Sequence, residues 1–150
     1  MIPVSPDSSA NLPQSPAVPE SERPSGGAVS VGIVLVSHSR ALAEAALDLA
    51  RRLIVAVDVP VELAAGLADG GLGTDPGAVV EAVERLAERC EGVLVLADLG
   101  SGIMSAEMAL EMLDPALAER TRLSAAPFVE GLLGAYGAAG IGKDLQAVAA

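Results

Sequence analysis

Residues 31–39 read VGIVLVSHS, an apolar and β-branched run that ends abruptly in three polar residues. A short continuous run of this kind is typical of a strand that is buried on both faces of a parallel sheet. Over residues 40–53, leucine and alanine recur at helical spacing, which predicts an amphipathic helix directly after the strand. The segment therefore reads as the start of an α/β fold, with Ser37, His38 and Ser39 at the carboxyl end of its first strand.

The same alternation of short apolar runs and helical segments continues along the chain. Further strands are predicted at residues 61–65, 92–97 and 121–125, and further helices over about 76–89, 103–113, 127–138 and 143–149. Residues 54–57 fit either an extension of the first helix or a short strand, and both readings stay open. The order βαβαβαβα predicts one three-layer α/β domain with a mainly parallel central sheet, helices on both faces and an active site at the carboxyl edge of the strands.

This domain is expected to span residues 30–150, because the segment before it has a different composition. Proline and serine dominate residues 1–29, and their apolar residues are isolated. Such a segment cannot bury enough surface to offset the entropy cost of ordering, so we expect a disordered tail.

The composition indicates an aliphatic core and an acidic surface. Hydrophobic residues make up 51% of the 150-residue chain, but only one is Tyr, one is Phe and none is Trp, so Val, Leu, Ile, Ala and Met must form the core. The net charge of -11 disfavours nucleic acid and anionic membranes and suits basic partners, although plain solubility explains it equally well. The single cysteine, Cys90, excludes an internal disulfide, and no apolar run approaches the roughly 20 residues of a membrane span. With no secretory signal pattern either, a cytoplasmic protein is expected.

Three loops are predicted to meet at the carboxyl edge of the sheet: residues 37–39, 66–75 and 98–101. A neutral imidazole is a nucleophile, so His38 is a candidate phosphoryl acceptor at this edge. The alternative is a histidine that caps the following helix or bonds its own backbone. Ser37 and Ser39 share this ambiguity, since either hydroxyl can cap the helix.

Asp98 closes the third predicted strand, which plausibly neighbours the first. A carboxylate there can orient the imidazole of His38 by accepting a hydrogen bond from one ring nitrogen, or it can simply start a turn. Thr74 or Asp75 is expected to cap one helix, and Ser101 another. The glycine-rich loop 66–75 lacks the spacing of a phosphate-binding loop, and one His with one Cys makes no recognisable metal set, so neither a metal nor a cofactor is expected.

Several short motifs together carry a family resemblance over essentially all of residues 31–140. They are VSHS at 36–39 with LAE at 42–44, GTD at 73–75, DLGS at 98–101, SAE at 105–107 with ALE at 109–111, and AAP at 125–127 with VEG at 129–131. The chain resembles the mannose-type enzyme IIA domains of the bacterial phosphotransferase system. Within them it is most similar to the phosphocarrier subunits of the phosphoenolpyruvate-dependent dihydroxyacetone kinase.

The resemblance implies a phosphotransferase that works through a phosphohistidine. His38 would take a phosphoryl group from the carrier HPr and pass it to ADP on a partner subunit of the kinase, which supports phosphorylation of dihydroxyacetone and hence glycerol metabolism. Asp98 would orient the imidazole, and the chain would form a homodimer. The residues expected to contact the phosphoryl group or a partner are Ser37, Ser39, Gly73, Thr74, Gly100 and Ser101. Two alternatives remain: a regulatory phosphohistidine module, and the enzyme IIA of a mannose-type sugar transporter.

Overall fold

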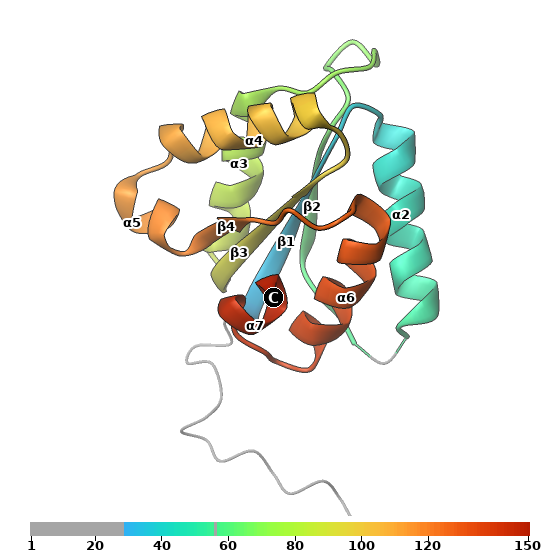
Figure 1. Cartoon of the computed structure of the whole chain (residues 1–150), viewed down its shortest axis with the longest axis vertical. Helices are drawn as coiled ribbons and strands as arrows, with labels where there is room; N and C mark the ends of the chain where they lie inside the picture. Colours follow the sequence, from blue (N-terminus) through green and yellow to red (C-terminus); the bar gives the residue numbers. More distant parts are fainter. Residues whose placement is uncertain (1–28, 56) are drawn as a thin grey trace, which may run out of the picture.

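The computed structural model describes residues 29–55 and 57–150 (Figure 1). Strands and helices alternate along most of this length, as the apolar pattern predicts. The strands are β1 (Val29–Ser37), β2 (Val61–Ala65), β3 (Cys90–Ala97) and β4 (Thr121–Leu123). The helices are α2 (Arg40–Leu53), α3 (Pro76–Ala87), α4 (Gly100–Met112), α5 (Pro115–Glu119), α6 (Phe128–Gly140) and α7 (Leu145–Ala149).

The strands form one sheet in the order β2-β1-β3-β4, and every pair of neighbours is parallel. β1 is central because its apolar run can be buried on both faces and bonded along both edges. Val36 of β1 pairs with Ala97 of β3, so the next residue after each strand lies at the same edge of the sheet. The predicted neighbourhood of the first and third strands is thereby confirmed.

Helices cover both faces of the sheet, which confirms the α/β fold class. In β1 and β3, successive side chains point to opposite faces, and each set enters its own core. Val31, Ile33 and Leu35 pack on the side of α2, α6 and α7, whereas Val34 and Val36 pack on the side of α3 and α4. Figure 1 shows the sheet between these two layers of helices. The two cores are mainly aliphatic and hold β1 and β3 at the centre of the molecule. The predicted composition of the core is wrong in two respects: Phe128 and Tyr136 are buried in it, and none of the methionines that the structure describes is.

Two predicted elements have the bounds that the structure gives. The amphipathic helix at residues 40–53 is α2, and the strand at residues 61–65 is β2. Between them, both readings of residues 54–57 are wrong where the structure describes them, because Ile54, Val55 and Val57 belong to neither a helix nor a strand. Ile54 instead ends α2, with its backbone N–H donating to the carbonyl of Ala50.

Other boundaries differ from the prediction. β1 begins at Val29, so the expected tail of residues 1–29 overlaps the strand by one residue, while the remainder of that tail lies outside the described residues. The fourth strand ends at Leu123 rather than at residue 125. The short helix α5 was not predicted; Pro115 occupies its first turn, where a proline is tolerated. None of the helices described is long and apolar enough to cross a membrane.

Candidate functional site

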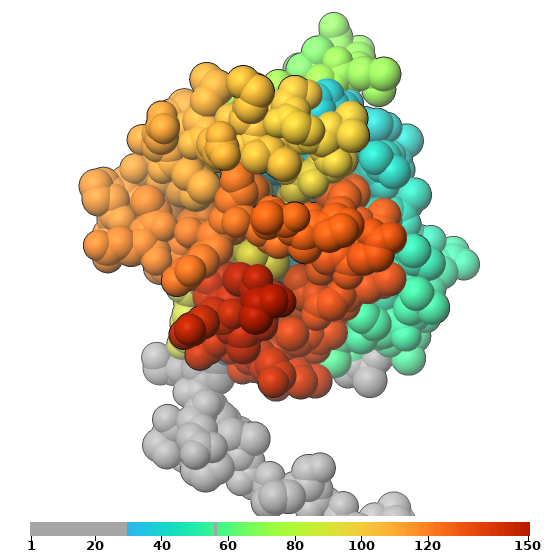
Figure 2. All heavy atoms as spheres, viewed as in Figure 1, coloured from blue at the N-terminus to red at the C-terminus, as the bar shows by residue number. Residues whose placement is uncertain are grey.

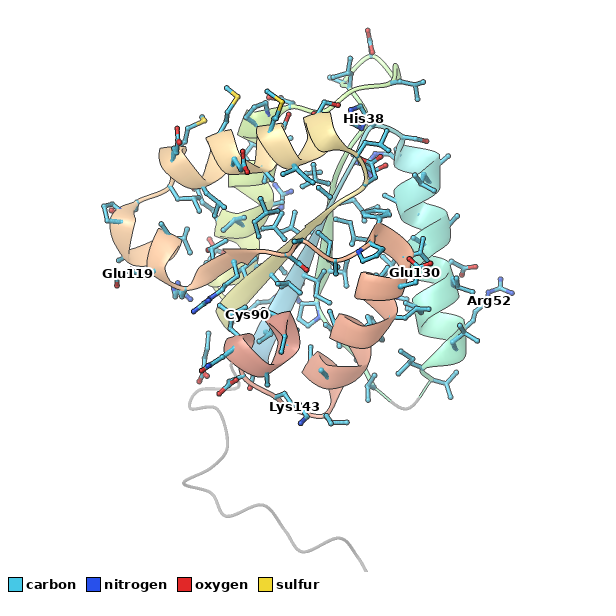
Figure 3. The ribbon with its side chains drawn as sticks, viewed as in Figure 1. His38, Arg52, Cys90, Glu119, Glu130 and Lys143 are labelled. Atoms are coloured by element: carbon cyan, nitrogen blue, oxygen red, sulfur yellow. The ribbon has the colours of Figure 1, made fainter. Side chains whose placement is uncertain are left out.

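His38 lies between β1 and α2, at the carboxyl edge of the sheet. β1 ends at Ser37 because the apolar run ends there, and α2 begins at Arg40 because the Ser39 hydroxyl caps it by accepting from the backbone N–H of Leu42 at 3.2 Å. His38 is therefore fixed between a buried strand and a capped helix. Its side chain remains 24% exposed, so one edge of the ring is accessible at the surface. Figure 3 shows His38 beside the start of α4.

Asp98 directly follows β3 and holds the backbone and the ring of His38 with separate oxygens. Oδ2 of Asp98 accepts from the backbone N–H of His38 at 3.0 Å, and Oδ1 lies 3.0 Å from Nδ1 of the ring. The carboxylate is only 5% exposed. Because a carboxylate accepts hydrogen bonds, this contact favours the tautomer that carries its proton on Nδ1. Nε2 then keeps its lone pair.

Ser37 holds Asp98 in place by a hydrogen bond from within the core. Its hydroxyl is fully buried, donates to Oδ2 of Asp98 at 2.9 Å and accepts from the backbone N–H of Ser39 at 3.1 Å. Burial alone would raise the pKa of Asp98, but the hydrogen bonds from the backbone and ring of His38 and from Ser37 outweigh it and leave the pKa below its usual value. The carboxylate is therefore charged at neutral pH, as orientation of the imidazole requires.

The start of α4 lies against the other nitrogen of the ring. The Ser101 hydroxyl is 2.5 Å from Nε2 of His38. With the proton on Nδ1, this hydroxyl is the donor and Nε2 the acceptor. A Cβ on Gly102 would lie 2.9 Å from Oδ1 of Asp98 and 3.6 Å from Cε1 of His38, so only glycine lets the helix approach this closely. The first N–H groups of a helix have no partner within the helix and favour an anion, here next to Nε2.

The glycine-rich loop is bonded to the same edge through its backbone. Gly73 donates its N–H to the carbonyl of His38 at 2.8 Å, with a φ of 149° in the region that favours glycine. The Thr74 hydroxyl lies 2.6 Å from that of Ser105, which ties the loop to α4. An open cleft of about 970 Å³ runs along the α3 side of this loop, and Arg40 and Thr74 are among the residues that line it. The loop thus braces His38 through backbone contacts.

The structure brings the predicted site residues to one edge but divides their roles. Ser37 and Ser101 contact Asp98 and His38 through their side chains, whereas Ser39 caps α2 and Gly73 contributes a backbone N–H. Gly100 is the first residue of α4, and a Cβ there would meet open space. Because Ser37 is fully buried, we expect it to act on Asp98 rather than to touch a phosphoryl group or a partner.

Of the two capping predictions, the one for Ser101 is wrong and the one for Thr74 or Asp75 is confirmed. Ser101 does not cap α4, since this helix already begins at Gly100 and Leu99 precedes it without a side-chain bond to the helix. Asp75, not Thr74, caps α3, because its carboxylate accepts from the N–H of Gly77.

Two residues that were not predicted as site residues contribute to its geometry: Gly102 and Ser105. A glycine inside the first turn of a helix was the available signal for Gly102, since glycine disfavours helices unless space requires it. Among the residues that the structure describes, no group of three or more His, Cys, Asp or Glu side chains could hold a metal ion.

The chain is similar in sequence to proteins of one known family. Residues 32–149 match the family model EIIA-man, described as the PTS system fructose IIA component. The chain belongs to this family. The match covers β1 to α7, and so includes every residue of the site.

Curated relatives carry a more specific name. The "PEP-dependent dihydroxyacetone kinase, phosphoryl donor subunit DhaM" of Pantoea ananatis is 45% identical over 120 residues, and that of Escherichia coli is 43% identical over 120 residues. Each match covers 79% of this chain, which spans a quarter (25%) of the length of those relatives. A relative from Listeria innocua, named subunit DhaM of a second such kinase, is 37% identical over 101 residues, covering 67% of this chain and 79% of its own.

Solved structures share the fold. A crystal structure of a protein of unknown function superposes with a TM-score of 0.72 at 29% identity and covers 80% of this chain and 90% of its own. The sigma-54 interaction domain protein of Enterococcus faecalis superposes with a TM-score of 0.60 at 20% identity, covering 81% of this chain and 86% of its own. The second likeness concerns the fold alone.

Proposed function

We propose that this domain relays a phosphoryl group between two proteins through Nε2 of His38. The donor is the phosphorylated carrier HPr, and the acceptor is ADP held by a partner subunit of a dihydroxyacetone kinase. The observation that carries the proposal is the 3.0 Å contact between Nδ1 of His38 and Oδ1 of Asp98. It leaves Nε2 without a proton, so that its electron pair can attack phosphorus once the Ser101 hydroxyl moves away.

The transfer has a simple balance of bonds. In the loading step, the lone pair of Nε2 forms a bond to phosphorus, and the bond from phosphorus to the donor atom breaks with its electron pair leaving on the donor. In the unloading step, an oxygen of the terminal phosphate of ADP attacks the same phosphorus, and the pair of the N–P bond returns to Nε2. Nδ1 keeps its proton throughout, and the charge of Asp98 stabilises the positive imidazole ring of the intermediate.

Ser101 has to move during this cycle. Its hydroxyl occupies the lone pair of Nε2 at 2.5 Å, so it must rotate away before phosphorus approaches. After transfer it can donate to a phosphoryl oxygen instead, together with the first N–H groups of α4. Because the hydroxyl gains a partner in the loaded state for the one it loses, its rotation costs little.

The choice of the kinase rests on the named relatives. Proteins that are 37–45% identical to this chain are phosphoryl donor subunits of a dihydroxyacetone kinase by name, and the Listeria relative matches over most of its own length. The ultimate substrate, HPr as donor, a cytoplasmic location and a homodimer are parts of the proposal that follow from the family resemblance. Sedimentation of the purified chain tests the homodimer.

Phosphorylation in a reconstituted system tests the relay. The chain is incubated with phosphoenolpyruvate, enzyme I and HPr, and the expected result is one acid-labile phosphoryl group per chain. His38→Gln should carry none, while Ser39→Ala, which leaves the imidazole in place, should still be labelled. Label retained by folded His38→Gln would contradict the proposal.

A second stage of the same experiment separates the candidate acceptors. The ADP-binding kinase subunit should discharge the label and form ATP. Discharge only by a mannose-type transporter subunit would instead favour a sugar transporter.

A further inference from the structure

An exposed methionine stripe runs along α4. Met104, Met108 and Met112 are 63%, 54% and 60% exposed, although methionine side chains are usually buried. They are spaced by four residues and therefore lie on one face of the helix. Figure 2 shows the surface of α4 open on the viewed face. No core contact explains these three side chains.

The stripe is continuous with the phosphoryl site. At about 100° per residue, Ser101 projects from α4 between the directions of Met108 and Met112, so the hydroxyl on Nε2 of His38 shares the methionine face. With a rise of about 1.5 Å per residue, Met104 and Met108 lie about 4 and 10 Å along the axis from Ser101. A protein that reaches Nε2 over an ordinary interface of about 800 Å² per partner must cover them.

Two exposed leucines lie on loops at the same carboxyl edge of the sheet. Leu99, 61% exposed, lies in the loop after β3, and Leu72, 76% exposed, lies in the glycine-rich loop that bonds to the backbone of His38 through Gly73. Two loops and one helix that meet at His38 therefore each expose apolar side chains. Exposed apolar side chains gathered on elements next to a reactive group indicate a contact site for another protein.

We propose that Met104 and Met108, with Leu72 and Leu99, form the docking surface for the proteins that exchange the phosphoryl group with His38. This inference rests on the proposed function. A relay needs the same surface to accept two unlike partners in turn. Methionine suits that task, because its unbranched side chain repacks against different shapes at low cost.

The charges around the stripe define the partner further. Residues 99–119 contain four acids and no base, and Glu107 and Glu111 are exposed beside the methionines. The glycine-rich loop adds Asp69 and Asp75. The fitting partner surface is therefore apolar at its centre and basic at its rim. A second copy of this acidic chain would meet like charges across the stripe, which disfavours self-association there.

A pair of matched double variants tests the docking surface. Met104→Gln with Met108→Gln keeps the side-chain length but removes the apolar contact. Leu53→Gln with Ile141→Gln is the control, because these two residues are similarly exposed, at 64% and 69%, and lie at the opposite end of the molecule (Figure 1). Each protein is phosphorylated with phosphorylated HPr and, separately, with the small donor phosphoramidate, which needs no docking surface.

The expected result is a KM for phosphorylated HPr about tenfold higher or more in the methionine variant, with kcat and the phosphoramidate rate within twofold of the unsubstituted chain. A tenfold change corresponds to about 1.4 kcal/mol of lost binding. An unchanged KM would overturn the inference, as would conversion of a dimer to a monomer, because the stripe would then be a self-contact. Failure of HPr to label the unsubstituted chain would refute the proposed function instead, and phosphoramidate distinguishes the two cases.

Discussion

Asp98→Asn replaces the carboxylate on which four donors converge. Oδ1 faces the ring Nδ1 of His38 and the backbone N–H of Leu99, and Oδ2 faces the hydroxyl of Ser37 and the backbone N–H of His38. An amide has one oxygen and one NH₂ group, so either orientation points a donor at a fixed backbone donor. If the NH₂ group takes the Oδ1 position, the ring adopts the opposite tautomer and Nε2 becomes protonated.

The magnitude follows from the hydrogen bonds at stake. A hydrogen bond to a charged group contributes roughly 1.5–3 kcal/mol, against roughly 0.5–1.5 kcal/mol for a neutral one, so exchange of the carboxylate for an amide weakens the preferred tautomer by about 1–2 kcal/mol. The free energy of unfolding of the Asp98→Asn variant should fall by a comparable amount, because the same hydrogen bonds are weakened. Since 1.4 kcal/mol corresponds to a factor of ten, the lost tautomer preference alone should slow phosphorylation of His38 by about five- to thirtyfold. The absence of the charge that stabilises the positive ring slows it further.

The assay is incorporation of acid-labile phosphate from phosphoramidate at neutral pH, which isolates chemistry from docking. Nitrogen NMR of the imidazole reports the tautomer directly, and urea denaturation reports the free energy of unfolding. Ser39→Ala serves as the control, because it removes a hydroxyl from the residue next to His38 that bonds to the backbone of Leu42 and not to Asp98. A folded Asp98→Asn protein that is phosphorylated within twofold of the unsubstituted rate, with an unchanged tautomer, would refute the reasoning.

Three further outcomes are expected. The pKa of Asp98 is lower in the folded state than in the unfolded state, so its contribution to stability is complete above the unfolded value of about 3.9 and is lost as pH falls through the folded value. In urea denaturation, the stability advantage of the unsubstituted chain over Asp98→Asn should therefore shrink below about pH 4. A stability difference that stays constant with pH would contradict this. Gly102→Ala should slow phosphoramidate labelling about tenfold, whereas Gly100→Ala, whose Cβ meets open space, should not; equal rates would show that helix approach is unimportant. Burial raises the pKa of the Cys90 thiol more than Arg89 and Arg120 lower it, so a disulfide reagent at pH 8 should react much faster in urea than in the native state, and rapid native reaction would indicate local opening.

The sequence predicted the elements whose local signals agree with the final packing. α2 has its amphipathic stripe and the capping hydroxyl of Ser39, so both its ends were predicted. β2 is bounded by Pro60 and Gly66, which interrupt the apolar run. The contact between His38 and Asp98 was predictable because parallel topology places the ends of neighbouring strands together.

The start of α4 was missed because tertiary contacts determine it. Gly100-Ser101-Gly102 has low helix propensity, and Leu99 has no side-chain oxygen with which to cap a helix. The helix nevertheless begins there: Asp98 takes the N–H of Leu99, and the glycine at 102 lets the first turn pack onto Asp98 and His38. A sequence pattern does not record such a contact across strands. The hydrogen bond from Ser37 to Asp98 was not predicted for the same reason, since the two residues are 61 positions apart in the chain.

The arrangement of the site suits a carrier that must meet more than one protein. His38 and Asp98 directly follow β1 and β3, where Val36 and Ala97 are paired and buried, so the core and not any partner sets their positions. The surrounding apolar side chains belong to loops and to the exposed face of α4, where rearrangement disturbs no core packing. The position of His38 thus depends on the core, whereas contact with a partner depends on exposed side chains. Changes at Met108 should therefore alter partner affinity without altering the reactivity of Nε2.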